Sequence, residues 1–196
     1  MANGEVITGF SKPYVARYSE SNGTVTYSNV QPLARGVSVE FEPSSGDPNT
    51  FYADNVEAEQ EGGKFNGGTV TLTVDGLFAE AERFVYGLPE AGADGWQEYD
   101  DDANAPFLGI GFIIRVMSAG VTSYKPVVFK KGKFDVKPLS ASTQEEQIDW
   151  QTTELTANIM RDDTAKRAWK AVGANVSTEA AAETALIEKL GGSVSA

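Results

Sequence analysis

The most regular feature of the sequence is an alternation of hydrophobic and polar residues, which is typical of β-strands that bury one face. In residues 69–74, valine and leucine alternate with threonine, and both Val and Thr favour extended backbone. Residues 37–42 repeat the alternation, and Pro43 is expected to end that strand because proline has no backbone N–H to donate. The two segments therefore predict half-buried strands.

Further strands are predicted at residues 13–18, 24–27, 49–54, 107–117, 123–129, 134–136 and 148–152. The first two of these strands flank Asn22 and Gly23, which can supply the positive φ angles of a tight hairpin. The run 107–117 is almost continuously hydrophobic, as expected of a central strand covered on both faces. In the returning strand Pro126 indicates an edge or a bulge, and residues 130–133 are expected to form a turn.

Helical patterns are fewer. Residues 77–86 place hydrophobic side chains on one face, with Asp75 as the expected N-cap and Gly87 as the C-terminal stop. Residues 177–190 form a second predicted helix, capped by the first or second residue of the segment, with a hydrophobic stripe that should lie on a neighbouring surface. A short third helix is expected over residues 163–172.

Together these elements predict a mainly β fold, a β-sandwich or partly closed β-barrel, with one flanking α-helix and a C-terminal helix. We expect a β domain over residues 1–160 and a helical C-terminal extension over residues 161–196. Residues 88–106 form one long acidic loop, and loops of this length tend to be functional or disordered.

Composition excludes much enzyme chemistry. The 196 residues include no Cys and no His, which rules out disulfides, thiol nucleophiles, Ser-His-Asp triads and Cys- or His-ligated metals. The net charge of -12 argues against a free nucleic-acid reader, which would be basic. No hydrophobic run approaches the roughly 20 residues that cross a bilayer. The start of the chain lacks a signal-peptide pattern, so we expect a protein that is made and kept in a cytoplasm or leaves it by lysis.

The remaining candidate sites are weak. Asp100, Asp102 and Asn104 have the spacing of the first ligands of a calcium loop, but the expected glycine and bidentate glutamate are missing. Glu145 and Glu146 lie in a polar segment rather than in an aromatic groove that would raise a carboxyl pKa. We therefore expect no catalytic residue, no metal and no cofactor.

Charge is distributed unevenly along the chain. Residues 88–106 hold six acidic and no basic residues, whereas residues 115–137 hold six basic residues and one acidic residue. Two such surfaces could meet between neighbouring copies of the chain, or they could be unrelated solvated tips, and charge alone leaves both interpretations open. Aromatic residues in the acidic loop favour an interface. The candidate self-assembly residues are Trp96, Tyr99, Asp100, Asp101, Asp102, Lys130, Lys131 and Lys133.

An ordered set of segments resembles the major tail protein (tail tube protein) of long, non-contractile-tailed phages. The segments are residues 51–55 (Phe-Tyr-Ala-Asp-Asn), 67–77, 106–112, 124–134 and 148–152, and the resemblance spans roughly residues 5–160. The acidic run 100–102 and the segment 160–196 depart from the family pattern.

The resemblance implies a structural virion protein and not an enzyme. Its copies would join edge to edge into rings, hexameric in the family, that stack into the tail tube. Partners would be further copies, a tape-measure protein, the tail terminator and distal tail proteins, with genomic DNA passing through the lumen without specific binding, and no membrane. A lumen that attracted phosphate would hold the DNA, so we expect the negative charge to be biased toward the lumen.

Two alternatives belong to other classes. One is a β-sandwich binding module, such as a decoration or baseplate domain, that recognises carbohydrate or protein through an aromatic-lined groove. The other is a hydrolase that uses only carboxylates, for which Glu145 and Glu146 would be the residues to replace.

Overall fold

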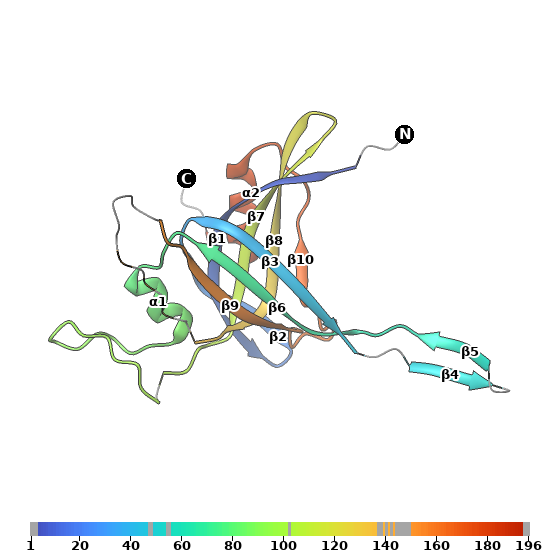
Figure 1. Ribbon diagram of the computed structural model, residues 1–196, viewed down its shortest axis with the longest axis horizontal. Coiled ribbons are helices and arrows are strands. Elements are labelled where there is room, and N and C mark those ends of the chain that lie inside the picture. The colour runs from blue at the N-terminus through green and yellow to red at the C-terminus, as the bar shows by residue number, and fades with distance from the viewer. Residues whose placement is uncertain are drawn as a thin grey trace.

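A computed structural model describes residues 4–46, 49–53, 56–101, 103–136, 139, 141, 143 and 150–193 of the chain (Figure 1). Within these residues the fold is mainly β, as predicted. The elements are β1 (Val6–Ser21), β2 (Thr24–Pro32), β3 (Gly36–Ser45), β4 (Asn49–Ala53), β5 (Val56–Glu61), β6 (Phe65–Val74), α1 (Ala79–Tyr86), β7 (Leu108–Ser118), β8 (Val121–Phe134), β9 (Thr153–Met160), β10 (Lys170–Val172) and α2 (Glu179–Lys189).

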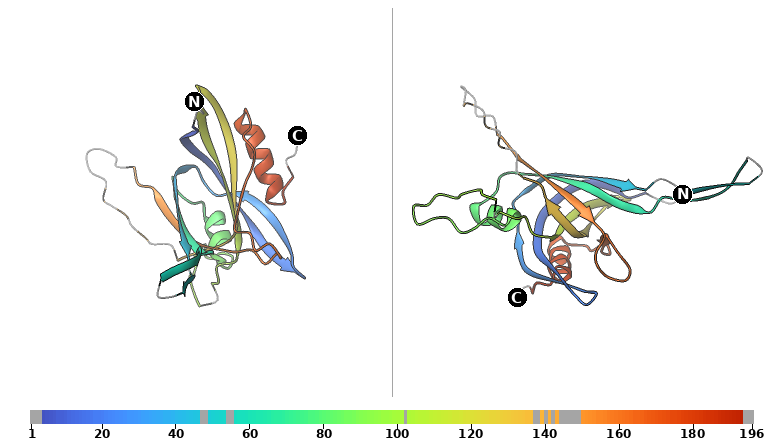
Figure 2. Two further views of the ribbon diagram at one scale, coloured as in Figure 1. Left: turned by 90° about the vertical axis from the view of Figure 1, so that its right-hand side faces the viewer. Right: turned by 90° about the horizontal axis from the view of Figure 1, so that it is seen from below.

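One antiparallel sheet forms the body, with the strand order β2-β1-β7-β8-β9-β6-β3. The side of β8 that faces away from β7 is shared by two strands, because β9 pairs with its last four residues and β10 pairs with residues 127–129. The β9-β6-β3 half is therefore joined to β8 only at the C-terminal end of that strand. The sheet curls, and its last strand, β3, contacts β1 (Figure 2). At this contact Gly36 lies against the ring of Phe10, where a Cβ would overlap the ring atoms.

The main hydrophobic core fills the inside of the curl. The predicted alternation in β6 is confirmed, because its valines and leucine are fully buried there together with the inward residues of β9. Aromatic rings from both halves meet in the same core: the centroids of Phe41 in β3 and Phe129 in β8 are 4.6 Å apart. Trp169, just before β10, stacks on Phe65 with a centroid distance of 4.2 Å.

A smaller core lies on the outer side of β1, β7 and β8, where α2 packs. Ala182, Leu186 and Leu190 of the helix are fully buried against this side of the sheet, and Thr178 caps the helix through its side-chain oxygen. A Cβ at Gly111 of β7 would lie 2.6 Å from a methyl carbon of Leu186, so glycine lets the helix approach closely. Because β7 is covered on both sides, its sequence is hydrophobic without alternation, as predicted.

Three sequence predictions about β-structure are wrong. Pro43 does not end β3, which continues to Ser45 because it is the last strand of the sheet, where a missing N–H need not break a ladder. Pro126 lies neither at an edge nor at a bulge, because it pairs in register with Ile113 of β7 and its carbonyl accepts the Gly173 N–H on the other side. Residues 130–133 form no turn; they continue β8, in which residues 131–134 pair with β9.

Predictions near the helices and the C-terminus also need correction. Residues 163–172 form an irregular segment followed by β10 and not a helix. Phe78, not Asp75, is the N-cap of α1, since Asp75 pairs with Arg35 instead. Of the predicted strand 148–152, residues 150–152 are irregular and the first two lie outside the described residues. Elements of the predicted extension 161–196 belong to the body: β10 joins the sheet and α2 covers it.

Two segments project from the body on opposite sides (Figure 1). The β4–β5 hairpin extends beyond the ends of β3 and β6, and the described residues of the loop after α1 extend from the other side. Apart from a few turns, that loop has no regular structure, as predicted for residues 88–106.

Candidate functional site

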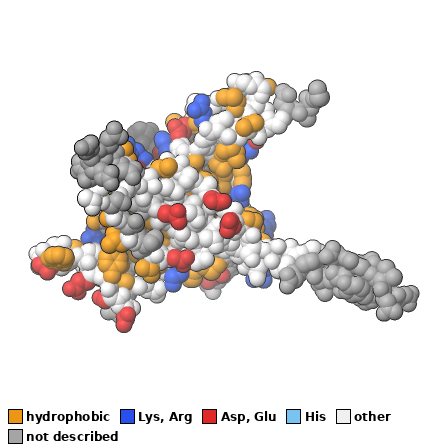
Figure 3. Space-filling model, viewed as in Figure 1, with side chains coloured by type: hydrophobic (Ala, Val, Ile, Leu, Met, Phe, Trp, Pro, Cys, Tyr) orange, Lys and Arg blue, Asp and Glu red, His pale blue; other side chains and the backbone are white. Residues whose placement is uncertain are grey.

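The outer side of β3, β6 and β9 forms a polar surface that no other described element covers, and we call it the polar face. Cross-strand pairing aligns its residues in rows, so that Glu40 lies opposite Thr71 and Thr71 opposite Thr156. The polar face consists of Ser38, Glu40, Glu42, Thr69, Thr71, Thr73, Glu154, Thr156 and Asn158. Neither helix covers it, and in the same view acidic side chains stand out on this surface (Figures 1 and 3).

None of the nine residues of the polar face is basic. The three glutamates are exposed, and the threonines between them are half-buried by their neighbours in the sheet. Hydroxyl groups and separated carboxylates give this surface a negative potential without a cluster that would bind a cation. The lysines of the predicted basic turn, Lys130, Lys131 and Lys133, lie on the next strand, β8, where Lys133 is opposite Asn158 and each lysine has an intramolecular partner.

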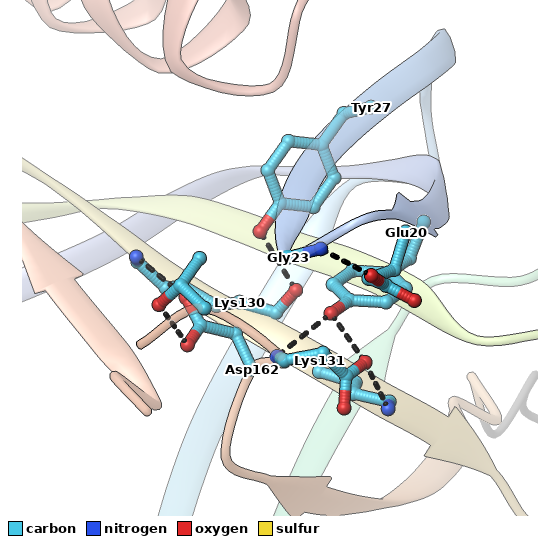
Figure 4. Close-up of polar contacts among 9 residues, drawn as sticks. Glu20, Gly23, Tyr27, Lys130, Lys131 and Asp162 are labelled. Atoms are coloured by element: carbon cyan, nitrogen blue, oxygen red, sulfur yellow. Dashed lines mark hydrogen bonds and ion pairs between the residues drawn. The ribbon is translucent and has the colours of Figure 1, made fainter. Parts of the chain in front are cut away.

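Lys130 is held by a buried carboxylate. Its Nζ lies 2.8 Å from Oδ2 of Asp162, a residue only 2% exposed, and Thr164 donates to Oδ1 of the same carboxylate at 2.7 Å. The Tyr27 hydroxyl donates to the backbone carbonyl of Lys130 at 2.8 Å (Figure 4). Burial raises the pKa of Asp162, but the hydrogen bonds from Lys130 and Thr164 outweigh it, and the net pKa is lowered.

Lys131 and Lys133 are also engaged within the chain. Nζ of Lys131 is 2.6 Å from Oδ2 of Asp163, which also accepts a hydrogen bond from the Tyr18 hydroxyl, and the hydrogen bond from Lys131 is the main reason that the Asp163 pKa is lowered. Lys133 donates to Oδ1 of Asn104 at 3.1 Å. The ring of Phe107 lies beneath both ammonium groups, 4.6 Å from that of Lys131.

The predicted basic turn is therefore an internally paired strand. Sequence reasoning missed Asp162 and Asp163 because it placed Asp163 and the residues after it in a helix. Two adjacent acids follow β9, and antiparallel pairing of β9 with β8 brings them beside the lysines. This part of the predicted charge complementarity is satisfied inside one chain rather than left for a neighbour.

The acidic loop displays the aromatic residues singled out from the sequence. Trp96 is 73% exposed and Tyr99 58% exposed. The Tyr99 hydroxyl donates to Oε1 of Glu82 on α1 at 2.9 Å, and burial, followed by this hydrogen bond, raises the pKa of Tyr99 to about 12. Asp100 and Asp101 are exposed in the same loop, and Asp102 lies outside the described residues.

A hydrophobic groove opens between β3 and the β1–β7–β8 half of the sheet, and we call it the apolar groove. It has a volume of about 390 Å³, and its lining includes the rings of Phe10, Phe41, Phe112 and Phe129. Lys170 is the one charged residue among those that line it, with its Nζ 6.0 Å from the centre of the Phe129 ring. In Figure 3 hydrophobic side chains gather in this hollow beneath the β7–β8 hairpin.

The two ends of the sheet also bear on assembly. In the described part of the chain, β2 and β3 each have a strand on one side only. Such edges carry backbone N–H and C=O groups that another strand can pair with.

Other site chemistry finds little support in the described residues. No group of three acidic side chains converges there as a metal site. Glu145 and Glu146, the residues of the hydrolase alternative, lie outside the described residues. Among the residues that were placed, no helix has the length and hydrophobicity to cross a membrane.

Comparison with known proteins gives no assignment. No protein-family model matches the chain, and no curated protein matches it. The functional proposal therefore rests on the fold and on the chemistry of its surfaces.

Proposed function

We propose that this chain is a structural protein whose copies form rings, six to a ring, that stack into a tube for DNA, as in the tails of long-tailed phages. The observation that carries the proposal is the polar face: a broad, helix-free sheet surface with exposed carboxylates and no basic residue, bordered by the edge strand β3. Such a surface suits the wall of a channel through which a polyanion must slide.

The electrostatic argument concerns retention of DNA. A wall of lysine or arginine would neutralise phosphates and release counterions, which binds DNA tightly at low salt. The carboxylates of Glu40, Glu42 and Glu154 repel phosphate instead, and the threonine hydroxyls between them carry no charge. A lumen built from this surface would pass DNA without holding it.

The assembly argument concerns the edges. A β2 edge of one copy can pair with the β3 edge of the next. Because the two edges differ, the contact is head-to-tail, and it gives a ring when the rotation between successive copies closes. In this role the chain acts in the virion tail, around a tape-measure protein and between a terminator and distal tail proteins. It has no catalytic function.

The first experiment asks whether the protein assembles. Concentrated protein is examined by negative-stain microscopy and sedimentation velocity, and we expect rings or tubes with a central channel. A particle that stays monomeric at every concentration would refute the proposal.

The second experiment asks which surface lines the channel. The double variant Glu40→Lys/Glu154→Lys places two lysines on the polar face, and Glu80→Lys/Glu188→Lys makes the same charge change at exposed positions on the two helices. We expect only assemblies of the first variant to retain DNA in a salt-dependent way. Equal retention by both variants would mean that the polar face does not line the lumen.

The apolar groove favours one other class of function, a binding module. The aromatic rings in its wall fit that alternative. However, the polar residues of its lining are Ser38 and Lys170, which are too few to satisfy the hydroxyls of a sugar. A protein side chain suits the groove better than carbohydrate. A monomer that binds a protein ligand through this groove would favour the module.

A further inference from the structure

The acidic loop presents a large hydrophobic side chain on an ordered turn. Oδ1 of Asp94 accepts a hydrogen bond from the backbone N–H of Trp96 at 3.2 Å, and the Gly92 N–H donates to the Trp96 carbonyl at 2.9 Å. Gly95 between them has a φ of 81°, a left-handed conformation that glycine adopts without strain. The turn thus fixes the backbone of Trp96 while its indole stays in solvent, which is a costly arrangement unless something covers it.

The apolar groove is a hydrophobic surface that no described side chain fills. The rings of Phe10, Phe41 and Phe112 form part of its wall, and Val37 at its margin is 54% exposed. A groove of about 390 Å³ accommodates an indole together with a neighbouring side chain. Its single charge is the ammonium group of Lys170, which has aromatic contacts but no ion pair among the described residues.

The loop of a chain is badly placed to fill the groove of the same chain. The loop extends from the α1 side of the body, whereas the groove opens beneath the β7–β8 hairpin on the other side (Figures 1 and 3). Around Trp96 the loop carries Glu90, Asp94 and Glu98, which complement the positive charge of Lys170. The loop of one copy and the groove of another therefore complement each other in hydrophobic character, in charge and in position.

We propose that Trp96 of one copy inserts into the apolar groove of a second copy, with the acidic residues of the loop beside Lys170. This inference rests on the proposed self-assembly and names one of its contacts. Loop and groove are different surfaces, so the contact is heterologous: each copy offers a loop on one side and a groove on the other. Such a contact propagates and does not end at a dimer, as the stacking of successive rings requires.

The central test replaces each side of the contact separately. Trp96→Ala removes the anchor, and Trp150→Ala is its control because Trp150 is also exposed, at 85%. Val37→Glu puts a carboxylate at the groove, and Val121→Glu, at the exposed tip of the β7–β8 hairpin, is its control. We expect the Trp96 and Val37 variants to raise the concentration needed for long assemblies about tenfold or more, as loss of a buried tryptophan anchor does at interfaces.

Mixing the two variants gives the sharper result. Trp96→Ala keeps an intact groove, and Val37→Glu keeps an intact loop, so a mixture can form the contact once and cannot extend it. Sedimentation velocity should then show a species of two joined units that neither variant forms alone. Each unit is a single copy or a ring. Mixtures of the two control variants should assemble like wild-type protein.

The outcomes separate this inference from the proposed function. If wild-type protein forms no assembly, the proposed function fails. If it assembles and Trp96→Ala assembles equally well, the proposed function stands and the Trp96 contact is refuted. If Val37→Glu blocks assembly while Trp96→Ala does not, Val37 acts through another contact, either the β3 edge or another segment in the groove, and the contact proposed here is wrong.

Discussion

The two halves of the sheet are built for different surroundings. The β1–β7–β8 half has hydrophobic residues on both sides, the main core within and α2 outside, so that β7 is buried along most of its length. The β3–β6–β9 half buries one side and leaves the polar face open, and residues 69–74 of β6 alternate between threonine and valine or leucine. One sheet can therefore hold a region that is covered on both sides and a region that is covered on one side. The first has strands with continuous hydrophobic sequence, and the second has strands in which hydrophobic and polar residues alternate.

The largest expected effect lies in the covered half. Leu186→Ala empties a fully buried position between α2 and β7, and it should lower the free energy of unfolding by about 2–5 kcal/mol. Chemical denaturation monitored by circular dichroism measures the change. Leu139→Ala makes the same substitution at a position that is 91% exposed and should change stability by less than about 0.5 kcal/mol. Equal effects at the two positions would mean that α2 does not pack on the sheet.

The next effect concerns the closeness of that packing. Gly111→Val adds side-chain atoms where even a Cβ would be 2.6 Å from Leu186, and overpacking of this kind costs about 3 kcal/mol. Because the two residues touch, we expect the double variant Gly111→Val/Leu186→Ala to be more stable than the sum of the single effects predicts, in a double-mutant cycle. Strict additivity would argue against the contact. Gly4→Ala, where no atom lies within 4 Å of the added Cβ, is the control.

The sequence predicted those parts of the fold in which one strand or helix carries its own signal. The alternation of β6, the continuous hydrophobic run of β7, the Asn22–Gly23 hairpin and the end of α1 at Gly87 are local patterns, and the structure confirms them. The errors arose where the partner of a segment decides its structure. Pro43 is tolerated because β3 ends the sheet, and the predicted turn at 130–133 stays extended because β9 pairs with residues 131–134.

The candidate surfaces were predictable to a similar degree. Exposure of Trp96 and Tyr99 follows from their place in a long acidic loop. The pairing of Lys130 and Lys131 with Asp162 and Asp163 depends on residues 32 positions apart in sequence, which no local pattern reveals. The polar face could be seen strand by strand, but that its three strands lie side by side required the strand order.

A third prediction concerns the junction between the two halves, where the 161–169 segment connects β9 to β10 along one side of β8. Asp162→Asn keeps the shape of the side chain and removes the charge that faces Lys130, which should cost about 1.5 kcal/mol at neutral pH. The pKa of Asp162 is lowered in the folded state, so its stabilising effect is fully present above the ordinary value of 3.8 and is lost as the pH falls through the folded-state pKa.

Urea denaturation of the wild type and the Asp162→Asn variant at several pH values tests this point. The difference in unfolding free energy should be constant from pH 7 to about pH 5 and should shrink below the ordinary aspartate pKa of 3.8. A difference that grows on acidification would have the wrong sign for a carboxylate held by a lysine. Asp101→Asn, at an exposed loop position, is the control for the charge change.

The smallest change in unfolding free energy is expected for a substitution on the polar face, and a small change would indicate that the face is open to solvent. Thr71→Val at the centre of that face exchanges a hydroxyl for a methyl group of similar size, and both residues favour strands, so the unfolding free energy should change by no more than about 0.5 kcal/mol. A loss above about 1 kcal/mol would mean that the hydroxyl has a buried partner, since only an unsatisfied group costs that much. The face would then be covered and not open, and the contrast between the two halves of the sheet would no longer support a channel wall.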